Sequence, residues 1–275
     1  MKYFKFFTLW ATFYWYCPSM KVVILAGGLG TRISEETSFL PKPMIRIGDD
    51  PILVHILRHY AHYKHEDFIV ALGYKGYVIK EYFVNFALHT SNVSIDLKTS
   101  EINYETKALQ SWNVDLVDTG DSTLTGGRVK RLQSKLNETF MLTYGDGLSD
   151  VNLDDLLAFH RSHGRLATVT AVAPPGRYGV LEISDTNLVN GFIEKPKGFG
   201  SEINGGFFVF EPGVIDLIEG DDEPLEEGLL PKLSKLGELS AFRHSGFWQS
   251  MDTLRDKRYL ESLLLQGNPP WISKP

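Results

Sequence analysis

A glycine-rich segment at residues 26–32 is the first feature of this sequence that could do chemistry. Its order is Ala-Gly-Gly-Leu-Gly-Thr-Arg, and it directly follows an apolar run. Glycines let a backbone approach a ligand closely, so that its N–H groups can point at phosphate oxygens. Thr31 and Arg32 add a hydroxyl and a guanidinium, which also bind phosphate. The segment favours a phosphate-binding loop, although a plain tight turn would use similar residues.

Two common nucleotide-binding motifs do not match this loop. The dinucleotide fingerprint Gly-x-Gly-x-x-Gly requires a glycine where this chain has Ile33. The other motif requires Gly-Lys followed by Ser or Thr, and the sequence contains no such triplet. A phosphate-binding role therefore points to a different class of nucleotide-binding protein.

Lys42 lies between two prolines shortly after this loop. Pro41 and Pro43 restrict the backbone on both sides, which holds the Lys42 ammonium at a defined place. An isolated lysine is usually a solvated surface residue. Its rigid setting and its position after the loop favour a phosphate-binding role for Lys42.

Two aspartates far apart in the sequence could share one metal ion. Asp146 lies in a Gly-Asp-Gly turn after a predicted strand, and Asp252 precedes the last predicted helix. Each has a structural alternative, as a turn residue or as a helix cap. Carboxylates from separate loops could together hold Mg²⁺, which shares its oxygen ligands with phosphates and water.

These motifs resemble the signature of the sugar-1-phosphate nucleotidyltransferases. Seven further stretches are similar to the glucose-1-phosphate cytidylyltransferases among them: residues 73–83, 112–131, 143–147, 174–181, 194–198, 203–208 and 246–261. The resemblance begins at Met20 and covers the rest of the chain. The thymidylyl relatives carry Lys-Gln-Leu-Leu-Pro where this chain has Pro-Lys-Pro-Met, which favours cytidine.

The resemblance implies a role for each matching residue. Metal binding falls to Asp146 and Asp252, and catalysis to Arg32, Lys42 and Lys195. Thr123 and Arg128 contact the nucleotide, and Arg128 follows a predicted helix start that itself favours an anion. Glu194 and Asn204 contact sugar hydroxyls. The substrate-binding residues as a whole are Leu25, Ala26, Gly27, Gly28, Leu29, Gly30, Thr31, Arg32, Lys42, Thr123, Arg128, Gly145, Glu194, Lys195 and Asn204.

The implied reaction joins CTP to α-D-glucose 1-phosphate and releases diphosphate, with Mg²⁺ as cofactor. The alternatives are another base (UTP, dTTP or GTP) and a non-catalytic protein that binds nucleotide-sugars. The resemblance also implies a cytoplasmic homohexamer that supplies CDP-glucose for the O-antigen of bacterial lipopolysaccharide.

The elements that must position these residues alternate between short apolar runs and amphipathic stretches. Strands are predicted at residues 21–26, 68–72, 93–97, 113–118, 139–143, 168–173, 179–183, 188–194 and 206–210. Helices are predicted after Pro51, at residues 77–86, between the caps Asn152 and Gly164, and at residues 253–264. This order predicts one α/β domain, residues 20–275, with a doubly wound, mostly parallel, Rossmann-like sheet. Helices cover both of its faces, ligand loops gather at one edge, and a small β-rich part binds the sugar.

The amino-acid composition excludes some classes of binding partner for this protein. The net charge of −6 argues against nucleic acid, and the single cysteine, Cys17, excludes an internal disulfide and suits a reducing compartment. Residues 1–19 form a separate extension rich in aromatic residues, with three interpretations: a signal peptide, an interfacial membrane anchor, or sequence translated upstream of a start at Met20. The third is favoured, and no stable membrane partner is expected.

Two further features could have either a functional or a purely structural role. Trp248 either lines the sugar pocket or is a buried structural residue. A run of histidines has helical spacing but no matching carboxylate, which favours a surface or subunit-contact face over a metal site: His55, His59, His62 and His65.

Overall fold

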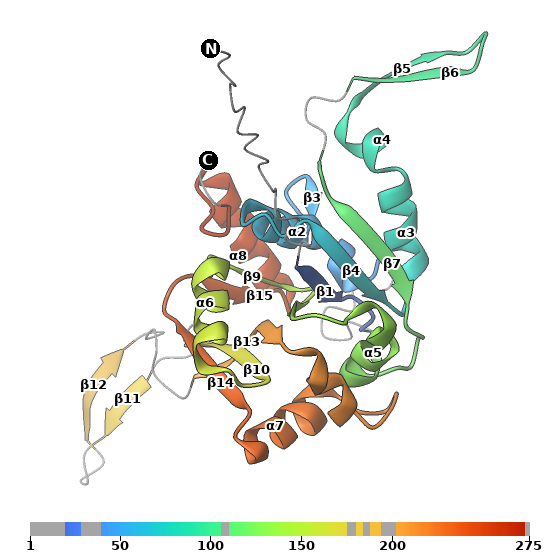
Figure 1. The fold of residues 1–275 in the computed structure, drawn as a ribbon. Helices are drawn as coiled ribbons and strands as arrows, with labels where there is room; N and C mark the ends of the chain where they lie inside the picture. The colour runs from blue at the N-terminus through green and yellow to red at the C-terminus, as the bar shows by residue number, and fades with distance from the viewer. Residues whose placement is uncertain are drawn as a thin grey trace, which may run out of the picture.

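A seven-stranded sheet forms the centre of the molecule in a computed structural model that describes residues 20–28, 40–105, 110–174, 180–183, 188–193 and 202–272 (Figure 1). The strand order is β14-β10-β13-β8-β1-β4-β7. Only β13 runs antiparallel to its neighbours, β10 and β8, among these strands. The bounds are β1 (Lys21–Leu25), β4 (Asp67–Leu72), β7 (Asn113–Asp118), β8 (Phe140–Tyr144), β10 (Ala167–Val172), β13 (Ile203–Phe210) and β14 (Leu239–His244).

The central strand β1 shows why the apolar runs form this sheet. It pairs in parallel with β4 on one side and β8 on the other. Val22 and Ile24 pack into one hydrophobic core, whereas Val23 and Leu25 pack into a second core on the opposite face. Successive side chains of a strand point to opposite faces, so a strand covered on both faces must be apolar throughout. The prediction of a doubly wound, mostly parallel sheet is confirmed.

Helices cover both faces of the sheet (Figure 1). The first core takes its helical residues from α2 (Ile52–His62), α3 (Gly76–Val84), α6 (Leu153–His163) and α8 (Leu254–Leu265). The second takes them from α5 (Thr125–Arg131), the 3₁₀ helix η4 (Pro212–Leu217), the π-helix η5 (Leu225–Leu229) and α7 (Leu230–Leu236). The remaining short helices are α4 (Phe86–Thr90) and the 3₁₀ helices η2 (Lys42–Met44) and η3 (Gln133–Lys135).

Among the described residues, four antiparallel ribbons lie outside the main sheet. They pair β2 (Arg46–Ile47) with β3 (Asp50–Pro51), β5 (Asn92–Asp96) with β6 (Glu101–Glu105), β9 (Gly147–Ser149) with β15 (Trp248–Ser250), and β11 (Val180–Ile183) with β12 (Val189–Ile193). The predicted strand at residues 93–97 is therefore a strand of a separate hairpin and not of the doubly wound sheet. The β11–β12 ribbon agrees with the small β-rich part that was predicted.

The helix signals are mostly confirmed. The Asn152 side chain accepts hydrogen bonds from the amides of Asp154 and Asp155 at the start of α6, and Gly164 ends that helix with a φ of 63°. The predicted helix at residues 77–86 is divided at Asn85 into α3 and α4.

The predicted surface position is wrong for three of the four histidines, whereas His62 is exposed as predicted. His55, His59 and His65 are buried on or just after α2, with exposed fractions of 3, 5 and 9%. Burial of His55 is tolerable because both ring nitrogens have partners: Nε2 lies 3.0 Å from the Ile47 carbonyl oxygen, and Trp271 Nε1 donates to Nδ1 at 3.3 Å. Within the described part of the chain, no helix is both long and apolar enough to cross a membrane.

Candidate active site

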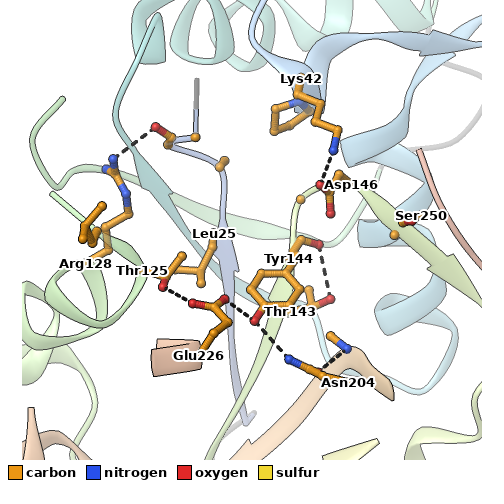
Figure 2. Close-up of a pocket in the computed structure, with 18 of the residues that line it drawn as sticks. Leu25, Lys42, Thr125, Arg128, Thr143, Tyr144, Asp146, Asn204, Glu226 and Ser250 are labelled. Atoms are coloured by element: carbon orange, nitrogen blue, oxygen red, sulfur yellow. Dashed lines mark hydrogen bonds and ion pairs between the residues drawn. The ribbon is translucent and has the colours of Figure 1, made fainter. Parts of the chain in front are cut away.

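A cavity of about 670 Å³ opens at the edge of the sheet where β1 and β8 end (Figure 2). This is the edge at which open α/β sheets bind their ligands. Every predicted site residue that the structure describes lines this cavity, although the residues span most of the sequence: Leu25, Ala26, Gly27, Gly28, Lys42, Thr123, Arg128, Gly145, Asp146, Asn204 and Asp252. The remaining predicted residues lie outside the described part of the chain: Leu29, Gly30, Thr31, Arg32, Glu194 and Lys195.

The Lys42 ammonium lies between the two predicted metal-binding carboxylates. Its Nζ donates to Asp146 Oδ2 at 2.6 Å and to Asp252 Oδ1 at 2.8 Å. Lys42 comes from η2, Asp146 from the link between β8 and β9, and Asp252 from the link between β15 and α8. Figure 2 shows Lys42 pointing down toward Asp146 at the rim of the cavity.

The β9–β15 ribbon holds the two carboxylates opposite each other. Ser250 pairs with Gly147 across the ribbon, and the Met251 amide donates to the Asp146 carbonyl at 2.8 Å. Ser250 Oγ donates to Asp252 Oδ2 at 2.8 Å, which orients that carboxylate. The ribbon therefore brings together side chains that are far apart in sequence.

Thr253, and not Asp252, caps helix α8. Its side chain accepts from the Asp256 amide, and the Asp256 carboxylate accepts from the Thr253 amide, which completes a capping box. The structural alternative for Asp252 is therefore excluded, and its Oδ1 faces Lys42.

Opposing effects act on Lys42, whose side chain is 12% exposed. Burial lowers the pKa of Lys42, but the charges and hydrogen bonds of Asp146 and Asp252 outweigh it, so that the pKa lies above its ordinary value. The ammonium stays protonated and offsets part of the negative charge of the carboxylate pair. Two carboxylates that converge on one cation form a donor set that suits Mg²⁺, because this ion takes few protein oxygens when phosphates supply the rest.

Arg128 lines the cavity, but its guanidinium donates hydrogen bonds to oxygen atoms of the protein itself. Its Nη1 donates to the Leu72 carbonyl at 2.9 Å and to Thr119 Oγ1 at 2.8 Å, and its Nη2 donates to the Gly27 carbonyl at 3.1 Å. A Cβ atom on Gly27 would lie 2.2 Å from Arg128 Cζ, so only glycine leaves room for the guanidinium. Arg128 therefore ties the glycine-rich segment after β1 to the ends of β4 and β7.

The predicted anion site at the start of α5 is partly used by the chain itself. The amide of Leu124 donates to the Asp221 carbonyl at 2.8 Å, and that of Gly127 donates to the Glu223 carbonyl at 3.2 Å. These hydrogen bonds hold the segment before η5 against α5. The two carbonyl oxygens thus take the place that an anion could have at these helix-terminal amides.

Trp248 lies at the cavity and is tied to the chain by its ring nitrogen. It lines the cavity, and its indole N–H donates to the Gly205 carbonyl at 2.6 Å. The side chain is half-buried.

Another wall of the cavity carries a linked group of polar side chains that was not predicted from the sequence: Thr125, Tyr144 and Glu226 (Figure 2). Tyr144 is the last residue of β8 and lies directly before the predicted site residues Gly145 and Asp146. This position in the sequence could have indicated that Tyr144 is also a site residue. Glu226 lies in η5 within no recognisable motif.

Comparison with known proteins identifies the family. The sequence profile described as "nucleotidyl transferase" matches residues 21–248. The chain belongs to the nucleotidyl transferase family. Two curated relatives of this nucleotidyl transferase, from Salmonella typhi and Salmonella typhimurium, are both named glucose-1-phosphate cytidylyltransferase. Each is 54% identical over 254 residues, which cover 92% of this chain and 98% of the relative.

Solved structures support the fold of this nucleotidyl transferase. The crystal structure of HddC from Yersinia pseudotuberculosis matches with a TM-score of 0.65 at 23% identity. The match covers 89% of this chain and 99% of HddC. At this identity the similarity establishes the fold alone.

Proposed function

We propose that this nucleotidyl transferase joins CTP to α-D-glucose 1-phosphate and releases CDP-glucose and diphosphate. The observation that carries the proposal is the cluster of Lys42, Asp146 and Asp252 inside a cavity that Asn204 also lines. The choice of substrates rests on the relatives with 54% identity, which align over 98% of their length.

In this reaction an oxygen of the sugar phosphate attacks the α-phosphorus of CTP. A phosphorus–oxygen bond forms there, and the bond from the α-phosphorus to the oxygen bridging to the β-phosphorus breaks. Diphosphate leaves with that bonding electron pair. The attacking oxygen is already ionised, so no covalent nucleophile is needed, and the protein contributes position and charge neutralisation.

The proposed roles follow from the charges around the cavity. Asp146 and Asp252 would hold Mg²⁺, which when bound would neutralise charge on the phosphates of CTP. Lys42 carries a compact charge on a flexible stem, so its ammonium can turn from the carboxylates to a phosphate oxygen of CTP.

The remaining assignments follow the family resemblance. Residues 25–32 and Gly145 surround the triphosphate, Thr123 and Arg128 act on the nucleotide, Glu194 and Asn204 on the sugar, and Lys195 and Arg32 on the phosphates. For Arg128 the contacts with backbone oxygens support an indirect action, in which it holds the loop of Gly27 in place.

A panel of nucleotides tests the proposal. Purified full-length protein would be incubated with Mg²⁺, glucose 1-phosphate and one of CTP, UTP, dTTP or GTP, and diphosphate release would be measured. CTP should give by far the highest kcat/KM. A higher value with another nucleotide would overturn the choice of base, and nucleotide binding without turnover with any of them would favour a non-catalytic protein.

The assembly and setting of the protein are part of the same proposal. The family resemblance supports a homohexamer that acts in the cytoplasm and supplies CDP-glucose for O-antigen synthesis. Light scattering of the full-length protein should give about six times the mass of the 31.1 kDa chain, and a monomeric mass at micromolar concentration would contradict the hexamer.

A further inference from the structure

A chain of hydrogen bonds along the cavity wall joins helix η5 to the start of β13. Tyr144 Oη donates to Glu226 Oε1 at 2.5 Å, and Asn204 Nδ2 donates to the same Tyr144 Oη at 3.2 Å. The Asn204 Oδ1 atom accepts from the Gly206 amide at 2.8 Å. All three side chains line the cavity, and Figure 2 shows the order Glu226, Tyr144, Asn204.

The carboxylate at one end of this chain sets the direction of its hydrogen bonds. An ionised carboxylate only accepts, so the single hydroxyl hydrogen of Tyr144 must point to Glu226. The Tyr144 oxygen is then left as an acceptor, and it faces the Nδ2 side of the Asn204 amide. Both ends of that amide are thereby fixed, and one hydrogen of Nδ2 remains to donate elsewhere in the cavity.

Glu226 is itself held in place. Thr125 Oγ1 donates to Glu226 Oε2 at 2.8 Å, and the same hydroxyl accepts from the Leu225 amide at 2.8 Å. Glu226 lies in the π-helix η5, a geometry that is rare and often occurs at functional sites. The carboxylate is therefore bound at both oxygens, one to α5 and one to β8.

The Tyr144 ring is held equally closely. Gly206 has a φ of 80°, and a Cβ atom there would lie 2.5 Å from Tyr144 Cδ2. Only a glycine at position 206 leaves room for the ring in this position.

We infer that Glu226 is a positioning residue for sugar recognition: through Tyr144 it holds the Asn204 amide with Nδ2 as a donor toward a sugar hydroxyl. This inference rests on the proposed function, in which Asn204 contacts the sugar. It adds to the site a carboxylate that acts on the sugar through Tyr144 and Asn204.

Removal of Glu226 should weaken recognition of the sugar but not of the nucleotide. Without the carboxylate, the Tyr144 hydroxyl can rotate and no longer accepts reliably from Asn204 Nδ2, so only the Gly206 amide still holds the Asn204 side chain. In Glu226→Ala we expect the Kd for CDP-glucose and the KM for glucose 1-phosphate to rise roughly tenfold, the scale of one lost hydrogen bond. The Kd for CTP should change less than twofold. Glu226→Gln keeps an oxygen that can accept from Tyr144 and should recover most of the affinity.

A matched control and a double variant separate this role from a loss of stability. Glu227→Ala removes the exposed neighbouring carboxylate of η5 and should leave every constant unchanged. Tyr144→Phe should reproduce the effect of Glu226→Ala. The two substitutions should not add when they are combined, because they interrupt the same chain of hydrogen bonds.

Calorimetry with CTP and with CDP-glucose, alongside steady-state kinetics, decides the matter. Selective weakening toward CDP-glucose with non-additive variants supports the inference. Equal affinities of Glu226→Ala and Glu227→Ala for CDP-glucose, in a wild-type protein that turns over CTP and glucose 1-phosphate, overturn this inference alone. A wild-type protein that binds neither CTP nor CDP-glucose overturns the inference together with the proposed function.

Discussion

Lys42 Nζ lies 2.6 Å from Asp146 Oδ2, although 104 residues separate the two in sequence. The same ammonium lies 2.8 Å from Asp252 Oδ1, another 106 residues along the chain. Opposite charges converge at the rim of the cavity because η2, the β8–β9 link and the β15–α8 link meet at one edge of the sheet. A reaction that brings two anions together needs positive charge, which the Lys42 ammonium supplies and which a divalent cation on the two carboxylates would supplement.

Lys42→Ala should lower kcat by a factor on the order of 10²–10³, by analogy with the loss of one preorganised donor. The reason is that the phosphates then meet without the positive charge that Lys42 supplies. Steady-state kinetics should be compared with Lys235→Ala, which removes an exposed lysine on α7. A loss of less than a few-fold in Lys42→Ala would remove this residue from the proposed mechanism.

Asp146→Asn and Asp252→Asn should each shift the dependence of the rate on Mg²⁺. We expect the concentration that gives half-maximal activity to rise on the order of tenfold or more, since each variant loses a charged ligand. Titration with MgCl₂ measures the shift. Asp154→Asn, at the exposed start of α6, is the control. Unchanged titration curves for both site variants would mean that neither carboxylate binds the metal.

Gly27→Ala should destabilise the protein through Arg128. A Cβ atom 2.2 Å from Arg128 Cζ forces the guanidinium away from its partners, and such overpacking costs about 1–3 kcal/mol of unfolding free energy. The same substitution in an Arg128→Ala background should cost less than about 0.5 kcal/mol, because the obstacle is gone. Urea unfolding of the four proteins gives both values. Equal costs in the two backgrounds would show that Arg128 is not the obstacle.

His59 should make the protein less stable in mild acid. Burial lowers the pKa of His59 to about 4, whereas an unfolded chain has a histidine pKa of about 6.5. The folded state binds fewer protons between these values. The contribution of neutral His59 to the free energy of unfolding is therefore fully present above pH 6.5 and is lost as the pH falls through 4.

This single residue should reduce the free energy of unfolding by roughly 2–3 kcal/mol between pH 7 and pH 4.5. Urea unfolding at the two pH values should show a smaller decrease for His59→Phe than for the wild type. His62→Gln, at an exposed position of the same helix, should keep the full decrease. The explanation fails if wild type and His59→Phe lose the same stability.

The buried strands and the placement of Lys42 could be predicted because their causes are local. The run around Val23 is apolar at every position, as a strand covered on both faces requires. Lys42 has a proline on either side, and its place at the cavity follows from that backbone.

The features that could not be predicted depend on partners remote in sequence. Asp252 could not be separated from a helix cap until Thr253 was seen to occupy the cap. The burial of His55 depends on Trp271, 216 residues away. Glu226 acquires its role from Tyr144, 82 residues away, and no local pattern marks Glu226. In each case the hydrogen-bond partner that decides the role of the polar group is fixed only by the tertiary fold.

The most direct test of the account is a ³¹P NMR time course of the wild-type protein with CTP, glucose 1-phosphate and Mg²⁺. The account predicts that the resonances of CTP and of the sugar phosphate disappear together. A diphosphodiester and free diphosphate should replace them in equal amounts. CTP that is hydrolysed while glucose 1-phosphate remains intact, or a spectrum that does not change, would contradict it.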